Sequence, residues 1–243
     1  MEVIHLAKDR GNAKISWLES NYSFSFANYY DPKKVQFGAL RVLNDDTIKP
    51  GRGFGLHPHD NMEIITIVLE GSLEHKDNKG NREIVHKGEI QVMSAGTGIE
   101  HSEINPSLAE DVKLLQIWIL PKLIDIAPSY AQKNFEYDKD LTPVASGFGE
   151  GLQINQEALV GMANIKDKWK YERRRKGNGV YIFVIEGHIT ARGHELARRD
   201  AIGIADDKEI ILEGESTKMS IFPCLMYPRL FAPPSLFGNG NAP

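Results

Sequence analysis

Short apolar segments separated by turn residues are the sequence feature that most limits how this chain can fold. In the first half, the segments end at turn-forming runs such as residues 77–81 and 94–98. Strands of four to eight residues at this spacing are typical of an all-β sandwich or barrel. The predicted strands in this half are residues 39–43, where Asn44 and the two aspartates after it predict a turn, 63–69, 72–76, 82–85, 89–93 and 113–120.

The second half repeats this organisation. An apolar segment ends in Glu-Gly at Glu70 and Gly71, and another does so at Glu186 and Gly187. This weak internal similarity predicts a duplicated β-domain. Residues 122–146 contain the expected boundary, and residues 123–131 could form a short helix. The predicted strands after it are residues 180–185, 188–191, 201–205, 209–212 and 218–225.

Composition excludes several classes of protein. The 243 residues contain one cysteine, Cys224, which excludes an internal disulfide framework and any multi-cysteine zinc or iron–sulfur site. The sequence contains no run of about 18 apolar residues, so no transmembrane helix is expected. The N-terminus also lacks the apolar centre of a signal peptide. The net charge of −4 argues against nucleic acid as a partner. We therefore expect a cytoplasmic, monomeric protein without a membrane or nucleic-acid partner.

Two motifs carry the candidate chemistry. His57 and His59 follow a Gly-rich stretch, and His101 and Glu103 follow another. Side chains two residues apart on a strand point to the same face, so each pair projects together. If both segments line a barrel, three imidazoles and one carboxylate converge, a set that suits iron and other divalent transition metals. Four ligands on an octahedral ion leave two positions open for substrate or dioxygen.

Other residues are expected to have structural roles, and some of them also have a functional alternative. Cys224 is expected to be a buried apolar residue. The basic run at residues 173–176 predicts a solvated loop, with an anion or partner site as the alternative. Three aromatic side chains could line a pocket entrance or pack in the core: Tyr29, Tyr30 and Phe54. Five histidines are expected at the surface without a ligand role: His5, His75, His86, His188 and His194.

At these motifs the sequence resembles the pirin family, including the bacterial pirin-like quercetin 2,3-dioxygenases, within the cupin superfamily. The resemblance covers about residues 15–121 and is diffuse over 150–243. The residues that carry it are 24–32, 54–59, 68–71 and 94–103. The resemblance implies two cupin jelly-roll barrels in tandem. The metal-binding domain is expected at residues 1–130 and a metal-free cupin domain at 146–232. Residues 131–145 form the expected linker between them, and residues 233–243 form an irregular tail.

The resemblance also implies a ligand set and an activity. The metal would be held by His57, His59, His101 and Glu103, with Fe²⁺ expected first and Ni, Co, Mn, Cu or Zn as alternatives. The implied reaction is the cleavage of a flavonol such as quercetin by O₂ with release of CO. In it, the flavonol 3-hydroxyl loses its proton to Glu103 and binds the metal. The alternative is a metal- or redox-responsive protein that binds a transcription factor or a metabolic enzyme without turnover.

Two details separate this chain from the general cupin pattern. Seven residues lie between Glu63 and Gly71 where the general motif has six, and Ser94 stands where proline is common. Glu63 is therefore expected either near the metal but not bound to it, or as a partly buried strand-end carboxylate with a hydrogen-bonding partner. A third chemistry, isomerisation of a phosphorylated sugar, is disfavoured because no Lys or Arg lies between Phe54 and Glu70.

Overall fold

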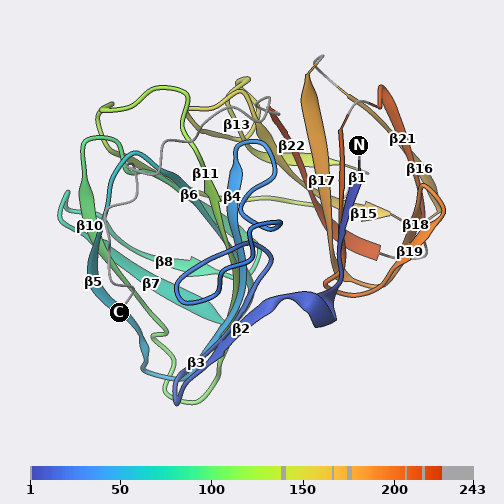
Figure 1. Cartoon of the computed structure of the whole chain (residues 1–243). Coiled ribbons are helices and arrows are strands. Elements are labelled where there is room, and N and C mark those ends of the chain that lie inside the picture. The colour runs from blue at the N-terminus through green and yellow to red at the C-terminus, as the bar shows by residue number, and fades with distance from the viewer. Residues whose placement is uncertain are drawn as a thin grey trace.

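The chain folds into two β-domains that lie side by side (Figure 1). This computed structural model describes residues 2–137, 141–165, 167–173, 177–205 and 207–214, together with the strand formed by 217–225. One 3-10 turn, Ala7–Asp9, is the helical element of these residues, and everything else is strand, turn or loop. In the described part of the chain, no helix has the length and apolar character needed to cross a membrane. The all-β prediction is therefore confirmed.

The first domain consists of a seven-stranded and a four-stranded sheet that face each other. The larger sheet has the order β12 (Ser129–Asn134), β9 (Glu89–Ser94), β6 (Glu63–Glu70), β11 (Val112–Ile119), β4 (Leu40–Ile48), β3 (Leu18–Tyr22) and β2 (Gly11–Lys14). The smaller sheet has the order β5 (Gly53–His59), β10 (Ile99–Ile104), β7 (Ser72–Asp77) and β8 (Arg82–His86).

The second domain repeats this pair of sheets. The larger sheet has the order β1 (Glu2–His5), β20 (Ala201–Ile204), β17 (Asn178–Glu186), β22 (Thr217–Leu225), β15 (Leu159–Ile165), β13 (Thr142–Ser146) and β14 (Leu152–Gln153). The smaller sheet has the order β16 (Lys168–Glu172), β21 (Glu209–Gly214), β18 (Ile189–Ala191) and β19 (His194–Leu196). The predicted duplication therefore extends to the number of strands in each sheet.

The two large sheets pack against each other and form the main apolar core of the molecule (Figure 1). This core joins side chains of both domains, among them Leu43 and Ile117 of the first and Tyr181 and Phe183 of the second. At its edge, Asp45 pairs with Arg199 at 2.8 Å and with Arg10 at 3.4 Å. The two domains are therefore held together by a shared core and ion pairs as well as by the connecting chain.

The interiors of the two barrels differ in polarity. The second barrel is filled by one continuous apolar cluster that includes Ile182, Ile202 and Leu212. The first contains two separate apolar clusters, and on β6 the polar Thr66 lies between Ile64 of one and Val68 of the other. Because these three residues share a face, a polar layer crosses the barrel at this level. Its buried members include Asn44, Asp46, Thr66, Gln91 and Gln116.

Two predictions about elements need correction. The segment predicted to stop at residue 43 continues as β4 to Ile48, because Asn44 and Asp46 are buried and Asp45 pairs with Arg199 of the other domain. The helix predicted over 123–131 is wrong: residues 122–125 are bends, and β12 begins at Ser129. The backbone of β12 instead pairs with β9 and forms the edge of the large sheet.

The strand pairing differs from the expected limits of the first domain at its N-terminal end and at the linker that follows it. Residues 2–5, expected in the first domain, form β1 and pair with β20 of the second domain. The expected linker, residues 131–145, contains most of β12 and the start of β13, which belong to different large sheets. Such pairings join residues far apart in sequence, so local patterns do not reveal them. The expected tail at 233–243 lies outside the described residues.

Candidate metal centre

Strands β5 and β10 bring three histidines together in the first domain. They run antiparallel, with His101 opposite His57 and Ile99 opposite His59. One ring nitrogen from each of His57, His59 and His101 lies within 4.8 Å of the others. The ring centroids are 4.4 Å apart for His57 and His101, and 4.9 Å apart for the other two pairs. The three predicted imidazoles therefore form one group.

The fourth predicted ligand, Glu103, belongs to an overlapping group. Its carboxylate lies within 4.8 Å of ring nitrogens of His75 and His101. The register of β10 against β5 shifts between His101 and Glu103, so that Glu103 lies opposite Phe54. Glu103 is buried, and the Gln116 Nε2 atom donates to its oxygens at 2.9 and 3.2 Å. His101 is thus the residue shared by the two groups.

The donor set fits a divalent transition metal. The Nδ1 atom of His57 lies 2.7 Å from the carbonyl oxygen of Gly55, which can only accept, so Nδ1 donates and Nε2 keeps its lone pair. The Nε2 atom of His101 is buried without a hydrogen-bond partner. Buried polar atoms are nearly always satisfied, so an unpartnered imidazole nitrogen beside two other imidazoles points to a missing ligand.

Burial and neighbouring charges keep His59 and His101 neutral. Burial, together with the charges of His101 and His57, lowers the pKa of His59 to about 3 against a smaller opposing effect of Glu103. Burial, with the charges of His57 and His75, also lowers the pKa of His101 to about 3. Neutral imidazole is the form that binds a metal, so both side chains are ready to act as ligands at physiological pH.

His75 was expected at the surface and is instead fully buried beside the candidate ligands. Its ring stacks on that of Tyr130 at a centroid distance of 4.7 Å. Its Nδ1 atom lies 3.3 Å from Nδ1 of His101, and its Nε2 atom lies 3.2 Å from Oδ2 of Asp77. Strand alternation could have revealed this position, because His75 shares a face with the apolar Leu73 two residues earlier.

Two aromatic side chains contact the candidate ligands. Trp118 lies edge-on to His59 at 5.0 Å, and Phe54 lies edge-on to His57 at 6.2 Å. Phe54 also packs against Trp17 and the apolar cluster that contains Val68, as its core alternative predicted, so it lies between that cluster and the histidines. Tyr30 is 75% exposed, while Tyr29 packs its ring directly over Gly11. The surroundings suit an aromatic ligand better than a phosphorylated one.

Glu63 lies away from the candidate ligands and connects the two domains. Its carboxylate accepts a hydrogen bond from Ser94 Oγ at 2.6 Å and another from the backbone N–H of Asn155 at 3.1 Å. It is buried, and burial raises its pKa although both hydrogen bonds lower it. Of the two alternatives for Glu63, the structure supports the strand-end carboxylate with hydrogen-bonding partners.

The remaining histidines have no ligand group among the described residues. His86 and His188 are exposed as predicted, and His194 pairs at the surface with Glu2. His5 is a correction: it is buried and bonds Tyr181 Oη at 2.9 Å, because β1 packs onto the second domain. The side chain of Cys224 and residues 174–176 of the basic run lie outside the described part of the chain.

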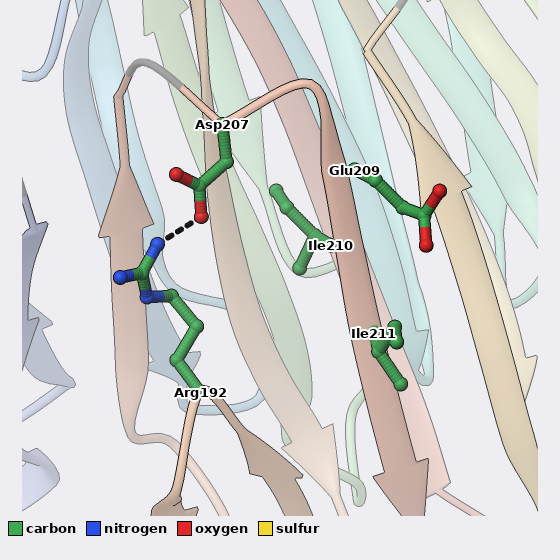
Figure 2. A pocket seen from close by; sticks show the side chains of 5 residues that line it. All are labelled: Arg192, Asp207, Glu209, Ile210 and Ile211. Atoms are coloured by element: carbon green, nitrogen blue, oxygen red, sulfur yellow. Dashed lines mark hydrogen bonds and ion pairs between the residues drawn. The ribbon is translucent and has the colours of Figure 1, made fainter.

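A surface depression on the second domain offers no comparable chemistry. It lies on the outer sheet and is lined by Arg192, Asp207 and residues 209–211 (Figure 2). Arg192 and Asp207 pair with each other across it, and Arg192 also contacts Glu2 at 3.0 Å. These charged groups already have partners, so the three histidines of the first domain remain the strongest candidate site.

Comparison with protein families and curated relatives matches both halves of the chain. Residues 3–119 match the family described as Pirin, and residues 144–222 match the family described as Quercetinase C-terminal cupin domain. The chain is 43% identical over 219 residues to a quercetin 2,3-dioxygenase of Escherichia coli K12, covering 89% of this chain and 95% of that protein. It is 40% identical over 210 residues to a pirin-like protein of Caulobacter vibrioides, covering 83% and 90%.

Solved structures show the same architecture. The bacterial pirin YhhW of Escherichia coli, in complex with nickel(II), superposes with a TM-score of 0.89 at 40% identity, covering 93% of this chain and 100% of that one. A quercetin 2,3-dioxygenase of Acinetobacter baumannii superposes with a TM-score of 0.75 at 18% identity, covering 92% and 85%. The second likeness is one of fold alone, and together they establish two tandem cupin domains.

Proposed function

Because this chain belongs to the pirin family, we propose that it is a metal-dependent dioxygenase that cleaves flavonols such as quercetin. The observation that carries the proposal is the group formed by His57, His59 and His101, in which the buried Nε2 of His101 lacks a partner. The relatives named as quercetin 2,3-dioxygenases support the substrate class. The aromatic surroundings of the histidines suit a flat aromatic substrate.

The three histidines and Glu103 would hold the ion. Fe²⁺ was expected from the resemblance, and the nickel complex of the Escherichia coli relative makes Ni²⁺ an equally strong choice. When bound, a divalent ion supplies positive charge that favours ionisation of the flavonol 3-hydroxyl, and a place for dioxygen. His57 is oriented for this role by Gly55, whose carbonyl fixes the ring through Nδ1.

Glu103 is the proposed base for the 3-hydroxyl proton. Its carboxylate is held by the amide of Gln116, and the hydroxyl of Thr66 lies 3.4 Å from Oε1. These contacts fix the side chain at the level of the polar layer, with His101 and His75 on the same side. A positioned base of this kind contributes about 10²- to 10⁴-fold to a rate.

The test is aerobic turnover of quercetin by protein loaded separately with Ni²⁺, Fe²⁺, Co²⁺, Mn²⁺, Cu²⁺ or Zn²⁺. We expect loss of the flavonol absorbance together with release of CO for at least one metal. The Glu103→Gln variant should be slower by about 10²-fold or more. His194→Gln, which removes a surface histidine paired with Glu2, serves as the control and should match the parent. Absence of CO with every metal would overturn the proposal.

A further inference from the structure

A line of hydrogen-bonding groups leads inward from His101 to the turn after β7. His101 Nδ1 lies 3.3 Å from His75 Nδ1, and His75 Nε2 lies 3.2 Å from Asp77 Oδ2. All three side chains are buried, those of His75 and Asp77 completely. The cause is the register of the small sheet: β10 lies next to β7, with His101 opposite Asp77 and Glu103 opposite His75.

The direction of this line is fixed at the Asp77 end. Asp77 Oδ1 accepts the backbone N–H groups of Lys79 and Asn81, at 2.9 and 3.0 Å, and Oδ2 accepts the Asn81 side-chain amide at 2.7 Å. A carboxylate that receives these donors can only accept from His75 as well, so His75 Nε2 donates. In a neutral imidazole the other nitrogen, Nδ1, then carries a lone pair and accepts.

The same reasoning applies to the next ring. Because His75 Nδ1 accepts, His101 Nδ1 must donate, and in a neutral imidazole this leaves the lone pair on His101 Nε2. Nε2 is the atom that is buried without a hydrogen-bond partner. The tautomer inferred from Asp77 therefore agrees with an independent feature of the structure. Tyr130, stacked on His75 at 4.7 Å, holds the plane of the middle ring.

We propose that Asp77 and His75 are positioning residues that set the tautomer of His101, so that its Nε2 is presented to a divalent transition metal. The inference rests on the metal site of the proposed function, although not on the identity of the substrate. Groups behind a metal-binding histidine orient its ring and raise its basicity, and their loss costs about 10- to 100-fold in metal affinity. The line supplies such support through a second imidazole.

Asp77→Asn is the first test, because it changes hydrogen-bond direction with little change in shape. The amide oxygen is required by the N–H groups of Lys79 and Asn81, so the amide NH₂ faces His75 and donates to it, while the Asn81 side-chain amide turns its oxygen toward the same NH₂. The tautomers of His75 and His101 then both reverse, and His101 carries its proton on Nε2. We expect about 10- to 100-fold weaker Ni²⁺ binding by calorimetry. Long-range ¹H–¹⁵N spectra of the metal-free protein should show the proton of His101 moving from Nδ1 to Nε2.

The control is Asp31→Asn, which alters another turn carboxylate that accepts a backbone N–H, that of Lys33, at 2.9 Å. This turn is exposed, and the variant should bind Ni²⁺ as the parent does. Two results would overturn the proposal. One is a proton on His101 Nε2 in the metal-free parent, and the other is parental Ni²⁺ affinity in a folded Asp77→Asn protein.

Changes at His75 decide the matter if Asp77→Asn fails to fold. Glutamine can accept from His101 and donate to Asp77, whereas leucine can do neither. We expect His75→Gln to bind Ni²⁺ more tightly than His75→Leu by about tenfold or more. Equal affinities of the two variants would overturn the proposal, and equal large losses would instead support His75 as a direct ligand with His101 and Glu103. These measurements need no turnover. Inactivity toward quercetin would therefore refute the proposed function and leave the role of Asp77 and His75 intact.

Discussion

Asp46 shows how a single side chain inside the first barrel can make stability depend on pH. It is buried in the polar layer and accepts a hydrogen bond from Ser20 Oγ. Burial raises its pKa to about 7, and the charges of Asp45 and Glu103 add to the rise while Ser20 opposes it. An aspartate in the unfolded chain titrates near pH 3.8. Between these values, only the folded state retains the proton.

We predict that Asp46→Asn stabilises the metal-free protein progressively as pH rises from about 4 to 7. In this window the unfolded parent releases a proton that the folded parent keeps, so this residue's contribution to stability falls as pH rises. The isosteric amide removes that slope, which is at most about 1.4 kcal/mol per pH unit. Denaturant unfolding at several pH values measures it.

The comparison must use the difference between variant and parent. His59 and His101, whose pKa values are lowered in the folded state, give the parent a slope of the opposite sign below pH 6.5. Both proteins share that contribution, so it cancels. A difference in unfolding free energy that stays constant from pH 4 to 8 would contradict the assigned pKa of Asp46.

At the scale of elements, the contact between β5 and β10 depends on Gly53. A Cβ atom at this position would lie 2.1 Å from the carbonyl oxygen of Glu103 and 2.7 Å from Cα of Ile104. The residue also has a φ of +156°, which L side chains rarely adopt. Only glycine lets the start of β5 approach β10 at the level of Glu103, so that the histidines further along β5 face His101.

We predict that Gly53→Ala separates the two strands and weakens Ni²⁺ binding. Overpacking of this kind costs about 1–3 kcal/mol of stability, and displacement of β5 also moves His57 and His59 relative to His101. Gly55→Ala is the matched control, because a Cβ atom two residues along the same strand meets nothing within 4 Å. Thermal unfolding and calorimetry of both variants provide the measurement, and equal behaviour would refute the role of Gly53.

At the scale of the whole molecule, we expect the shared core to make the two domains unfold as one cooperative unit. Asp45 on β4 of the first domain pairs with Arg199, and its side chain is 15% exposed against 5% for Arg199. Arg10 contacts the same carboxylate oxygen. Removing Asp45 would leave Arg10 and Arg199 buried without that carboxylate, and of its ion pairs Arg199 would keep the longer 3.7 Å contact with the exposed Glu186. Such a loss is more costly than never having had the pair.

We predict that Asp45→Ala lowers the free energy of unfolding by about 3–5 kcal/mol while keeping a single transition. Glu19→Ala is the control, because Glu19 and its partner Lys14 are exposed and such a pair contributes about 1 kcal/mol or less. Differential scanning calorimetry measures both. Two separate transitions in the parent protein would contradict a shared core, and a loss no larger than that of the control would contradict the buried pair.

The sequence by itself determined what depends on local periodicity. Strand alternation predicted that His57 and His59 share a face and that His101 and Glu103 share another, and it predicted the all-β fold. The same alternation places His75 on one face with Leu73, so the expected surface position of His75 was wrong. These features follow from the alternation of side chains along one extended strand, which is the same whichever strand lies beside it.

Only the tertiary structure decided which strands meet and in what register. It placed β7 beside β10, so that Asp77 and His75 stand behind His101, and it paired residues 2–5 with a strand about 200 residues away. It also turned Asn44, Asp45 and Asp46 from a predicted turn into a strand whose polar groups are satisfied or buried. Strands pair through backbone hydrogen bonds that nearly all residues can make. The sequence pattern therefore determines which face of a strand a side chain occupies, while tertiary packing determines which strand lies next to it.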